Sequence, residues 1–208
     1  MRMPAIPQNF LDRIGSLLSD RQRVLLGLAG APGSGKSTLA QALQQAFADV
    51  SIIVPMDGFH LANTELQRLG FAGRKGAPET FDAAGYVALL RRIREQRPEE
   101  TIYAPEFRRE IEEPIAGAIP VHSSVQLIIT EGNYLLVESG AWAEIAGLLD
   151  ETWYVDVDPT LRVQRLIDRH VHFGRSRSAA EEWVYSSDEK NAQLIEATRS
   201  RAHVVFRW

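Results

Sequence analysis

A glycine-rich segment between an apolar run and a helical pattern constrains this chain more than any other feature. Residues 27–40, GLAGAPGSGKSTLA, contain four glycines and a proline. The apolar run before them, RVLLGLAG at 23–30, does not alternate and is typical of a short, fully buried strand. Within the segment, residues 30–37 fit the spacing G-x-x-x-x-G-K-[ST]. The pattern predicts a strand, a loop of largely bare backbone and a helix.

The loop composition indicates a phosphate site. Glycines allow backbone angles and close approaches that a Cβ would block, so successive N–H groups can converge on a polyphosphate. The helix that follows directs its N-terminal dipole at the same anion. We expect Lys36 to reach the β- and γ-phosphates, Ser37 to bind Mg²⁺ and Thr38 to lie beside the α-phosphate. The predicted nucleotide-binding set is Gly30, Gly33, Ser34, Gly35, Lys36, Ser37 and Thr38.

Short apolar runs that alternate with helical patterns predict an α/β fold with a parallel sheet. The runs lie at 23–30, 50–57, 125–132, 151–158 and 202–208. The helical patterns lie at 9–19, 37–48, 82–96, 141–149, 159–170 and 178–200, with Asp82 as the N-cap of the third. The least regular stretches, 61–81 and 97–122, separate the second and third strands and could accommodate a substrate-binding excursion.

Composition narrows the class of protein. A chain of 208 residues with 45% hydrophobic residues fits a single domain. No apolar run approaches the roughly 20 residues needed to span a bilayer, so we expect a cytoplasmic protein without membrane insertion. The absence of cysteine excludes disulfides and thiolate chemistry, and the net charge of −4 argues against binding to nucleic acid.

Two acids follow predicted strands beside the glycine loop. Asp57 ends the second strand in MDGFH, and Glu131 ends the third in IITEG. The carboxyl ends of parallel strands form the ligand crevice of open α/β sheets. Asp57 there could accept the proton of a substrate hydroxyl, and Glu131 could hold Mg²⁺. The alternative is that each acid only closes a turn with the glycine that follows it.

Arginines concentrate between residues 159 and 178. Arg162, Arg165 and Arg169 fall on one helical face, and Arg175 and Arg177 follow around Gly174. Such a cluster suits a mobile lid that closes cations over a transferring phosphate. A solvated charged face remains the alternative interpretation.

Taken in order, these motifs resemble the P-loop small-molecule kinases grouped as uridine kinase, pantothenate kinase and phosphoribulokinase. The loop, DGFH, TEG, the arginine-rich helix and the segment 74–93 carry the likeness, which is strongest to bacterial fructose transport system kinases. The resemblance implies ATP, Mg²⁺ and a three-layer α/β/α P-loop NTPase fold whose five parallel strands lie in the order 2-3-1-4-5. It also implies one kinase domain over 1–208, with a helical lid at about 160–180 and a substrate-binding excursion at about 58–122.

The same resemblance implies roles for individual residues. Lys36 and Ser37 bind phosphate and metal, Asp57 is the base, Glu131 belongs to the metal shell, and Arg165 and Arg169 act from the lid. His60 and Asn191 are expected beside the acceptor, and Arg201, or alternatively Arg199, beside the adenine. The implied reaction transfers the γ-phosphoryl group of ATP to a hydroxyl of a small metabolite.

The segment TIYAPEFRRE at 101–110 departs from the patterns of pantothenate and uridine kinases. It offers Tyr103, Phe107, Arg108 and Arg109, an apolar surface beside two guanidinium groups, so we hypothesise an anionic acceptor. Alternatively, these arginines pair with the glutamates of the same segment, Glu106, Glu110, Glu112 and Glu113. A nucleoside, a pantothenate-like acid, a sugar and a sugar phosphate remain open as acceptors.

A second functional class is also open. A regulatory ATP-binding switch that hydrolyses slowly would use the same loop, although the chain has no N-K-x-D sequence of the kind that reads guanine in GTPases. The aromatic stretch EEWVYSS at 181–187 is expected to pack against the lid or a second subunit, which leaves a homodimer open.

Overall fold

A five-stranded parallel sheet forms the centre of the molecule. The computed structural model describes residues 5–208. Its sheet contains β1 (Val24–Ala29), β2 (Ser51–Pro55), β5 (Leu127–Gly132), β6 (Glu151–Asp156) and β7 (Val204–Arg207). The spatial order is β2-β5-β1-β6-β7, and every pairing is parallel. Counted among the sheet strands alone, this is the predicted order 2-3-1-4-5.

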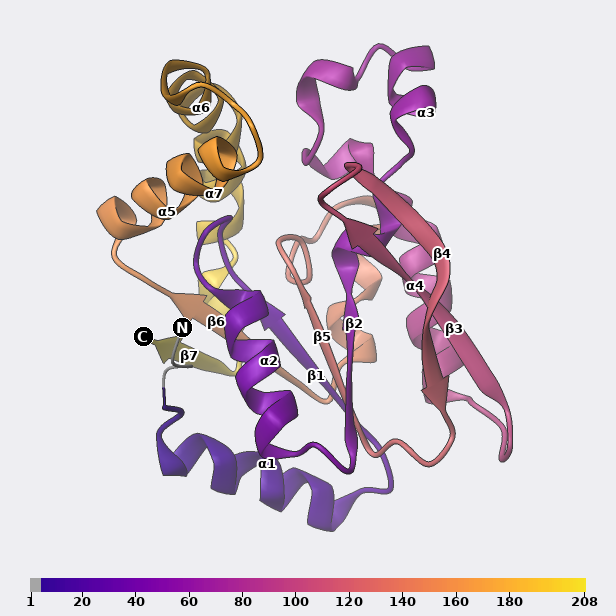
Figure 1. Ribbon diagram of the computed structural model, residues 1–208. Helices are drawn as coiled ribbons and strands as arrows, with labels where there is room; N and C mark the ends of the chain where they lie inside the picture. Colours follow the sequence, from indigo (N-terminus) through magenta and orange to yellow (C-terminus); the bar gives the residue numbers. More distant parts are fainter. Residues whose placement is uncertain (1–4) are drawn as a thin grey trace.

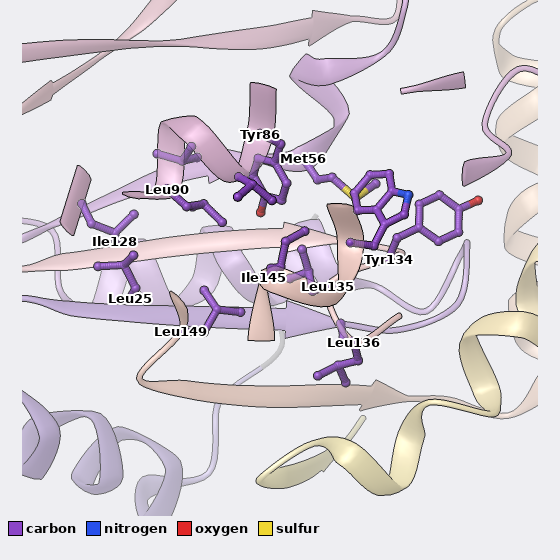
Figure 2. Packing of buried hydrophobic residues seen from close by; sticks show 14 of the residues in the cluster. Leu25, Met56, Tyr86, Leu90, Ile128, Tyr134, Leu135, Leu136, Ile145 and Leu149 are labelled. Atoms are coloured by element: carbon purple, nitrogen blue, oxygen red, sulfur yellow. The ribbon is translucent and has the colours of Figure 1, made fainter. Parts of the chain in front are cut away.

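Helices cover both faces of the sheet and confirm the predicted three layers (Figure 1). On one face, α1 (Gln8–Asp20) and α2 (Lys36–Ala46) pack against alternate residues of β1, such as Leu26. On the other, α4 (Ala83–Arg94) and the 3₁₀ turns η4 (Gly140–Glu144) and η5 (Ala146–Leu148) cover Leu25 and its neighbours. Figure 2 shows Tyr86 and Leu90 of α4 in this second core layer.

Capping fixes the start of α4 where the sequence predicts it. The Asp82 carboxylate accepts a hydrogen bond of 2.8 Å from the backbone N–H of Gly85. Two predictions of regular helix were wrong in detail. Residues 141–149 form two 3₁₀ turns, because a stretch this short that contains Gly147 is a marginal α-helix. The helix expected over 178–200 is divided by a π turn and ends at Glu196.

The irregular stretch 97–122 contains a β-hairpin that the sequence did not predict. Strands β3 (Thr101–Arg108) and β4 (Glu113–His122) pair antiparallel as a separate two-stranded sheet. Pro105, Pro114, Gly117 and Pro120 interrupt the alternation that would have revealed these strands. The hairpin approaches the end of β2 so closely that a Cβ on Gly58 would lie 2.4 Å from the Pro105 carbonyl oxygen.

Two groups of elements rise on either side of the carboxyl ends of the sheet strands (Figure 1). One group is α5 (Pro159–His172), α6 (Arg177–Trp183), the π turn η6 (Val184–Asp188) and α7 (Glu189–Glu196), which we call the helical arm. The other contains α3 (Asn63–Arg68), the short turns η2 (Ala72–Arg74) and η3 (Pro78–Thr80), and the hairpin. The chain returns to the sheet through the 3₁₀ turn η7 (Arg199–Arg201), which precedes β7. Within residues 5–208, no helix is long and apolar enough to cross a membrane.

Candidate active site

The two groups enclose a cavity of about 970 Å³ above the glycine loop. Its lining comes from the loop, from the turn η1 (Met56–Phe59) after β2, from the excursion and from the helical arm. The lining includes charged side chains of both signs: Lys36, Asp57, Lys75, Arg109, Glu112, Glu131, Arg165, Arg169, Arg175 and Asp188. Segments distant in the sequence therefore converge on one chemical site.

The glycine loop presents uncapped backbone donors to this cavity. Gly35 is the N-cap of α2 at φ 95°, and no side chain caps the helix. The first N–H groups of an α-helix have no partner inside the helix, so those of Lys36, Ser37 and Thr38 can bind an anion. Lys36 is 7% exposed and donates to the carbonyl of Ala31 at 3.1 Å. Burial lowers the pKa of Lys36 to about 8, against the opposing charges of Glu131 and Asp57.

Gly33 fixes the contact between the loop and the helical arm. Its φ is 78°, and a Cβ at this position would lie 2.9 Å from the carbonyl oxygen of Arg162 and from Leu166 Cγ in α5. The carbonyl oxygen belongs to the backbone of a helix and cannot move aside alone. Gly33 is therefore needed both for its conformation and for its lack of a side chain.

We expect Gly33→Ala to lower the free energy of unfolding by about 1–3 kcal/mol, the usual cost of a residue held in a disfavoured conformation. ATP should also bind more weakly, because the loop and α5 must separate. Urea denaturation and calorimetric titration with ATP measure the two effects. Gly73→Ala is the matched control, since a Cβ there meets nothing within 4 Å. Equal stability of the two variants would contradict the prediction.

Ser37 and Glu131 form an oxygen pair beside the loop. The Ser37 hydroxyl donates to Glu131 Oε1 at 2.9 Å, and Glu131 is 7% exposed at the end of β5. Burial and the charge of Asp57 raise the pKa of Glu131, against the influence of Lys36 and Ser37. Mg²⁺ usually takes one or two protein oxygens and completes its shell with water and phosphate oxygens. The pair therefore fits a divalent cation that is held together with a nucleotide.

Asp57 lies in η1, two residues beyond the end of β2. Its Oδ2 accepts a hydrogen bond of 3.1 Å from Arg109 Nη2. Burial would raise the pKa of the Asp57 carboxyl, but the basic side chains around it outweigh burial and hold the pKa below its ordinary value: His60, Arg109, Lys36 and Arg169. Asp57 is therefore ionised at neutral pH and able to accept a proton.

Aromatic rings and a lysine form the wall near Asp57. The ring centroids of His60 and Phe107 are 4.5 Å apart, and those of His60 and Phe81 are 4.0 Å apart. Burial lowers the pKa of His60, against the charge of Asp57 and the hydrogen bond to its backbone. Lys75 Nζ lies 5.1 Å from the centroid of the Phe107 ring. This wall offers flat apolar surface together with charge.

The helical arm supplies cations from the opposite side. Arg165 and Arg169 both line the cavity, and neither forms an ion pair with an acid within residues 5–208. Arg162, by contrast, is buried and pairs with Glu189 at 2.5 Å, so it holds α5 to α7. Asn191 Nδ2 donates to the carbonyl of Gly76 at 3.4 Å, which joins the arm to the excursion.

Comparison with known proteins agrees with this arrangement. Residues 25–208 match the family model described as the Phosphoribulokinase / Uridine kinase family. The chain belongs to that family. The family comprises small-molecule kinases that use ATP, generally with a divalent metal, so the chain is an ATP-dependent phosphotransferase with an alcohol group as acceptor.

Individual relatives support the assignment. A Schizosaccharomyces pombe protein provisionally named a uridine kinase is 36% identical over 192 residues, which are 88% of this chain and 80% of the relative. A crystal structure from Silicibacter sp. TM1040, provisionally described as a fructose transport system kinase, has a TM-score of 0.85 and 34% identity, covering 97% of this chain and 100% of that one. YFH7 from Saccharomyces cerevisiae, with 18% identity and a TM-score of 0.82 over 98% of this chain and 99% of its own, shares the fold.

Most residues predicted for the site of this kinase-family chain line the cavity. They are Gly33, Gly35, Lys36, Ser37, Thr38, Asp57, His60, Phe107, Glu131, Arg165, Arg169 and Asn191. Gly30 and Ser34 belong to the loop but do not line the cavity, and the Ser34 hydroxyl is buried with no hydrogen-bond partner within residues 5–208.

Besides Gly30 and Ser34, three predicted residues lie outside the cavity lining. Tyr103 is 60% exposed, Arg108 pairs with Glu106 at 2.6 Å, and Arg201 pairs with Glu138. Tyr103 and Arg108 occupy the two exposed positions of β3, and neither lines the cavity. We therefore do not include these three residues in the proposed site.

The sequence interpretation did not select several lining residues. Lys75 and Asn63 lie in an excursion without periodicity, whereas Arg109 was named from the sequence but could not be distinguished there from Arg108. Trp208 covers the loop so closely that a Cβ on Gly35 would lie 2.8 Å from Trp208 Nε1. The basic pair RK at 74–75 was the one signal in the excursion that could have indicated Lys75.

Proposed function

We propose that this chain transfers the γ-phosphoryl group of ATP, with Mg²⁺, to a hydroxyl group of a small metabolite. One observation carries the proposal. The Asp57 carboxylate, the Lys36 ammonium and the Ser37–Glu131 pair line a single cavity at the carboxyl ends of neighbouring strands. A base, a phosphate-binding cation and a metal-binding pair are the parts that phosphoryl transfer to an alcohol requires.

The chain's own residues account for the transfer. The acceptor oxygen attacks the γ-phosphorus in line, its proton passes to Asp57, and the bond from the γ-phosphorus to the bridging oxygen breaks to release ADP. Lys36 and the N-terminus of α2 hold the phosphates. Arg165 and Arg169 face the same space and stabilise the charge that develops on the transferring group.

Mg²⁺ is proposed at Ser37 and Glu131, where it would neutralise charge on the phosphates. The two acids of the site then have separate roles, because Glu131 is bonded to Ser37 whereas Asp57 faces the excursion. Like charges also interact here, since Asp57 raises the pKa of Glu131. A bound cation relieves this repulsion and leaves both carboxylates ionised.

The acceptor binds against the wall formed by the rings of His60, Phe81 and Phe107. The cavity of about 970 Å³ is at the upper end of the roughly 300–1,000 Å³ that small-molecule sites occupy, which supports a nucleotide together with a metabolite of sugar, nucleoside or pantothenate-like size. The provisional names of the relatives, a uridine kinase in one case and a fructose transport system kinase in another, do not agree on one acceptor. The proposal therefore rests on the side chains around Asp57.

Acceptor-dependent ADP release tests the proposed function. Purified protein with ATP and Mg²⁺ should release ADP when a panel of nucleosides, vitamins, sugars and sugar phosphates contains the acceptor, and should release little without it. A regulatory ATP-hydrolysing switch would instead release ADP at the same rate with or without any member of the panel. That result would overturn the kinase proposal in favour of the switch.

A further inference from the structure

A basic pair on the excursion side of the cavity has no role in nucleotide binding as described above. Arg109 lies in the turn between β3 and β4, and Lys75 follows η2. Both cations approach the same ring, since the Arg109 guanidinium carbon is 5.8 Å and Lys75 Nζ 5.1 Å from the centroid of Phe107. This ring in turn packs on His60. The two charges therefore converge on the wall that faces the acceptor.

Arg109 also contacts the proposed base directly. One of its nitrogens, Nη2, donates to Asp57 Oδ2 at 3.1 Å. Within residues 5–208, this is the single hydrogen bond that Arg109 forms with an acid. A guanidinium group has five N–H donors in a planar fork. Most of its donors are thus available to a second acceptor atom beside the Asp57 carboxylate.

Binding of an acceptor changes the surroundings of this ion pair. When a hydroxyl group donates to Asp57, that carboxylate is shared between the hydroxyl and Arg109, and the cavity becomes less hydrated. With a neutral acceptor, the positive charge of the Arg109 guanidinium would be balanced less well than before, because it would share Asp57 and lose hydration. An acceptor with its own carboxylate or phosphate would supply a second anion to the free donors, in the geometry that Arg binds best.

Neighbouring oxygen atoms hold the Lys75 ammonium group in a position where it could bind the same anionic group. Its Nζ donates to Asn63 Oδ1 at 2.6 Å and to the carbonyl of Glu112, and the Glu112 carboxylate is 4.0 Å away. Two neutral oxygens therefore orient the ammonium group, and its nearest acid is at the limit of an ion pair. Burial lowers the pKa of Lys75, against the charges of Glu112 and Glu113. An added anion would favour its charged form.

We propose that the acceptor carries an anionic group, a carboxylate or a phosphate, which Arg109 and Lys75 bind beside the hydroxyl that is phosphorylated. This inference rests on the proposed function, because it takes the site of phosphoryl transfer to be at Asp57. The 3.1 Å contact between Arg109 and Asp57 places the anion and the reacting hydroxyl close together on one small molecule. Arg109 is then the residue that determines specificity.

Direct binding measurements test this inference. Protein saturated with Mg²⁺ and a non-hydrolysable ATP analogue is titrated by calorimetry with matched pairs: glycerol and glycerate, ribose and ribose 5-phosphate, pantothenol and pantothenate. At least one anionic member should bind about 10- to 100-fold more tightly than its neutral partner, the range expected for hydrogen bonds to a charged group. The pairs also distinguish a carboxylate from a phosphate.

Variants assign the preference to its residues. Arg109→Gln should bring the two members of the preferred pair to similar dissociation constants while the affinity for ATP is unchanged, and Lys75→Gln should reduce the difference. Arg68→Gln is the control, because Arg68 is exposed on α3 and pairs with Glu65. Circular dichroism verifies that each variant is folded.

The outcomes separate this inference from the proposed function. If no anionic member binds more tightly than its neutral partner, or if Arg109→Gln retains the preference, the anionic site is refuted. ADP release with neutral acceptors alone would also refute it while supporting the kinase. Selective anion binding that depends on Arg109, with no ADP release from any pair, would instead support the site and refute phosphoryl transfer at Asp57.

Discussion

Asp57→Asn should lower kcat for acceptor phosphorylation by about 10³-fold, within the range typical of a lost general base. The amide has the size of the carboxylate and can still accept the hydrogen bond from Arg109, which now joins Arg109 Nη2 to Asp57 Oδ2. It cannot accept the hydroxyl proton. The affinity for ATP should change little, because the loop and α2 bind the phosphates from a different segment. Steady-state ADP release and calorimetric titration with ATP measure the two quantities.

The control for this variant is Asp49→Asn, which alters an exposed acid at the opposite end of β2. Its kcat should equal that of the unmodified protein. If Asp57→Asn loses little activity, Asp57 is not the base. The acceptor hydroxyl then gives its proton to another group, or to water after the phosphoryl group has been transferred. Acceptor-independent ADP release at an unchanged rate in Asp57→Asn would contradict the kinase assignment itself.

The sheet and the loop could be predicted because their physical causes are local. The central strand β1 is buried on both faces and therefore appears as an uninterrupted apolar run, Val24–Ala29. The loop needs positive φ at Gly33 and Gly35, which glycine alone adopts readily. The closeness of Asp57 and Glu131 in space could also be predicted, because the carboxyl ends of parallel strands meet at one edge of the sheet.

The acceptor wall could not be predicted, because it depends on long-range contacts in irregular segments. Arg109 reaches Asp57 across 52 residues of sequence. Its neighbour Arg108 lies on the exposed side of β3 and pairs with Glu106. The glutamate-pairing alternative holds for Arg108, whereas Arg109 lines the cavity and the anionic acceptor stays a prediction. Only the position of the turn after Arg108 separates them.

Glu131→Gln should raise the Mg²⁺ concentration for half-maximal activity by roughly 10- to 100-fold, the loss that altered metal shells typically produce. The amide oxygen can still accept the hydrogen bond that now joins Ser37 Oγ to Glu131 Oε1 at 2.9 Å, but it offers no negative charge to the metal. ADP release measured over a range of Mg²⁺ concentrations at saturating ATP gives this quantity.

Stability distinguishes a metal-binding role of Glu131 from a structural one. Burial and Asp57 raise the pKa of Glu131, so its ionised form is disfavoured in the folded metal-free protein, and the neutral amide should not lower the free energy of unfolding. Glu151 is the matched control. It is buried at the start of β6, a strand that β1 separates from β5, and pairs with Arg13 at 2.5 Å, so Glu151→Gln should lower stability and leave the Mg²⁺ requirement unchanged. Loss of stability in Glu131→Gln with an unaltered Mg²⁺ requirement would identify the Glu131 carboxylate as structural. We expect the metal-binding role instead, because the fold disfavours the charge of this buried acid and such a charge persists only where something binds it.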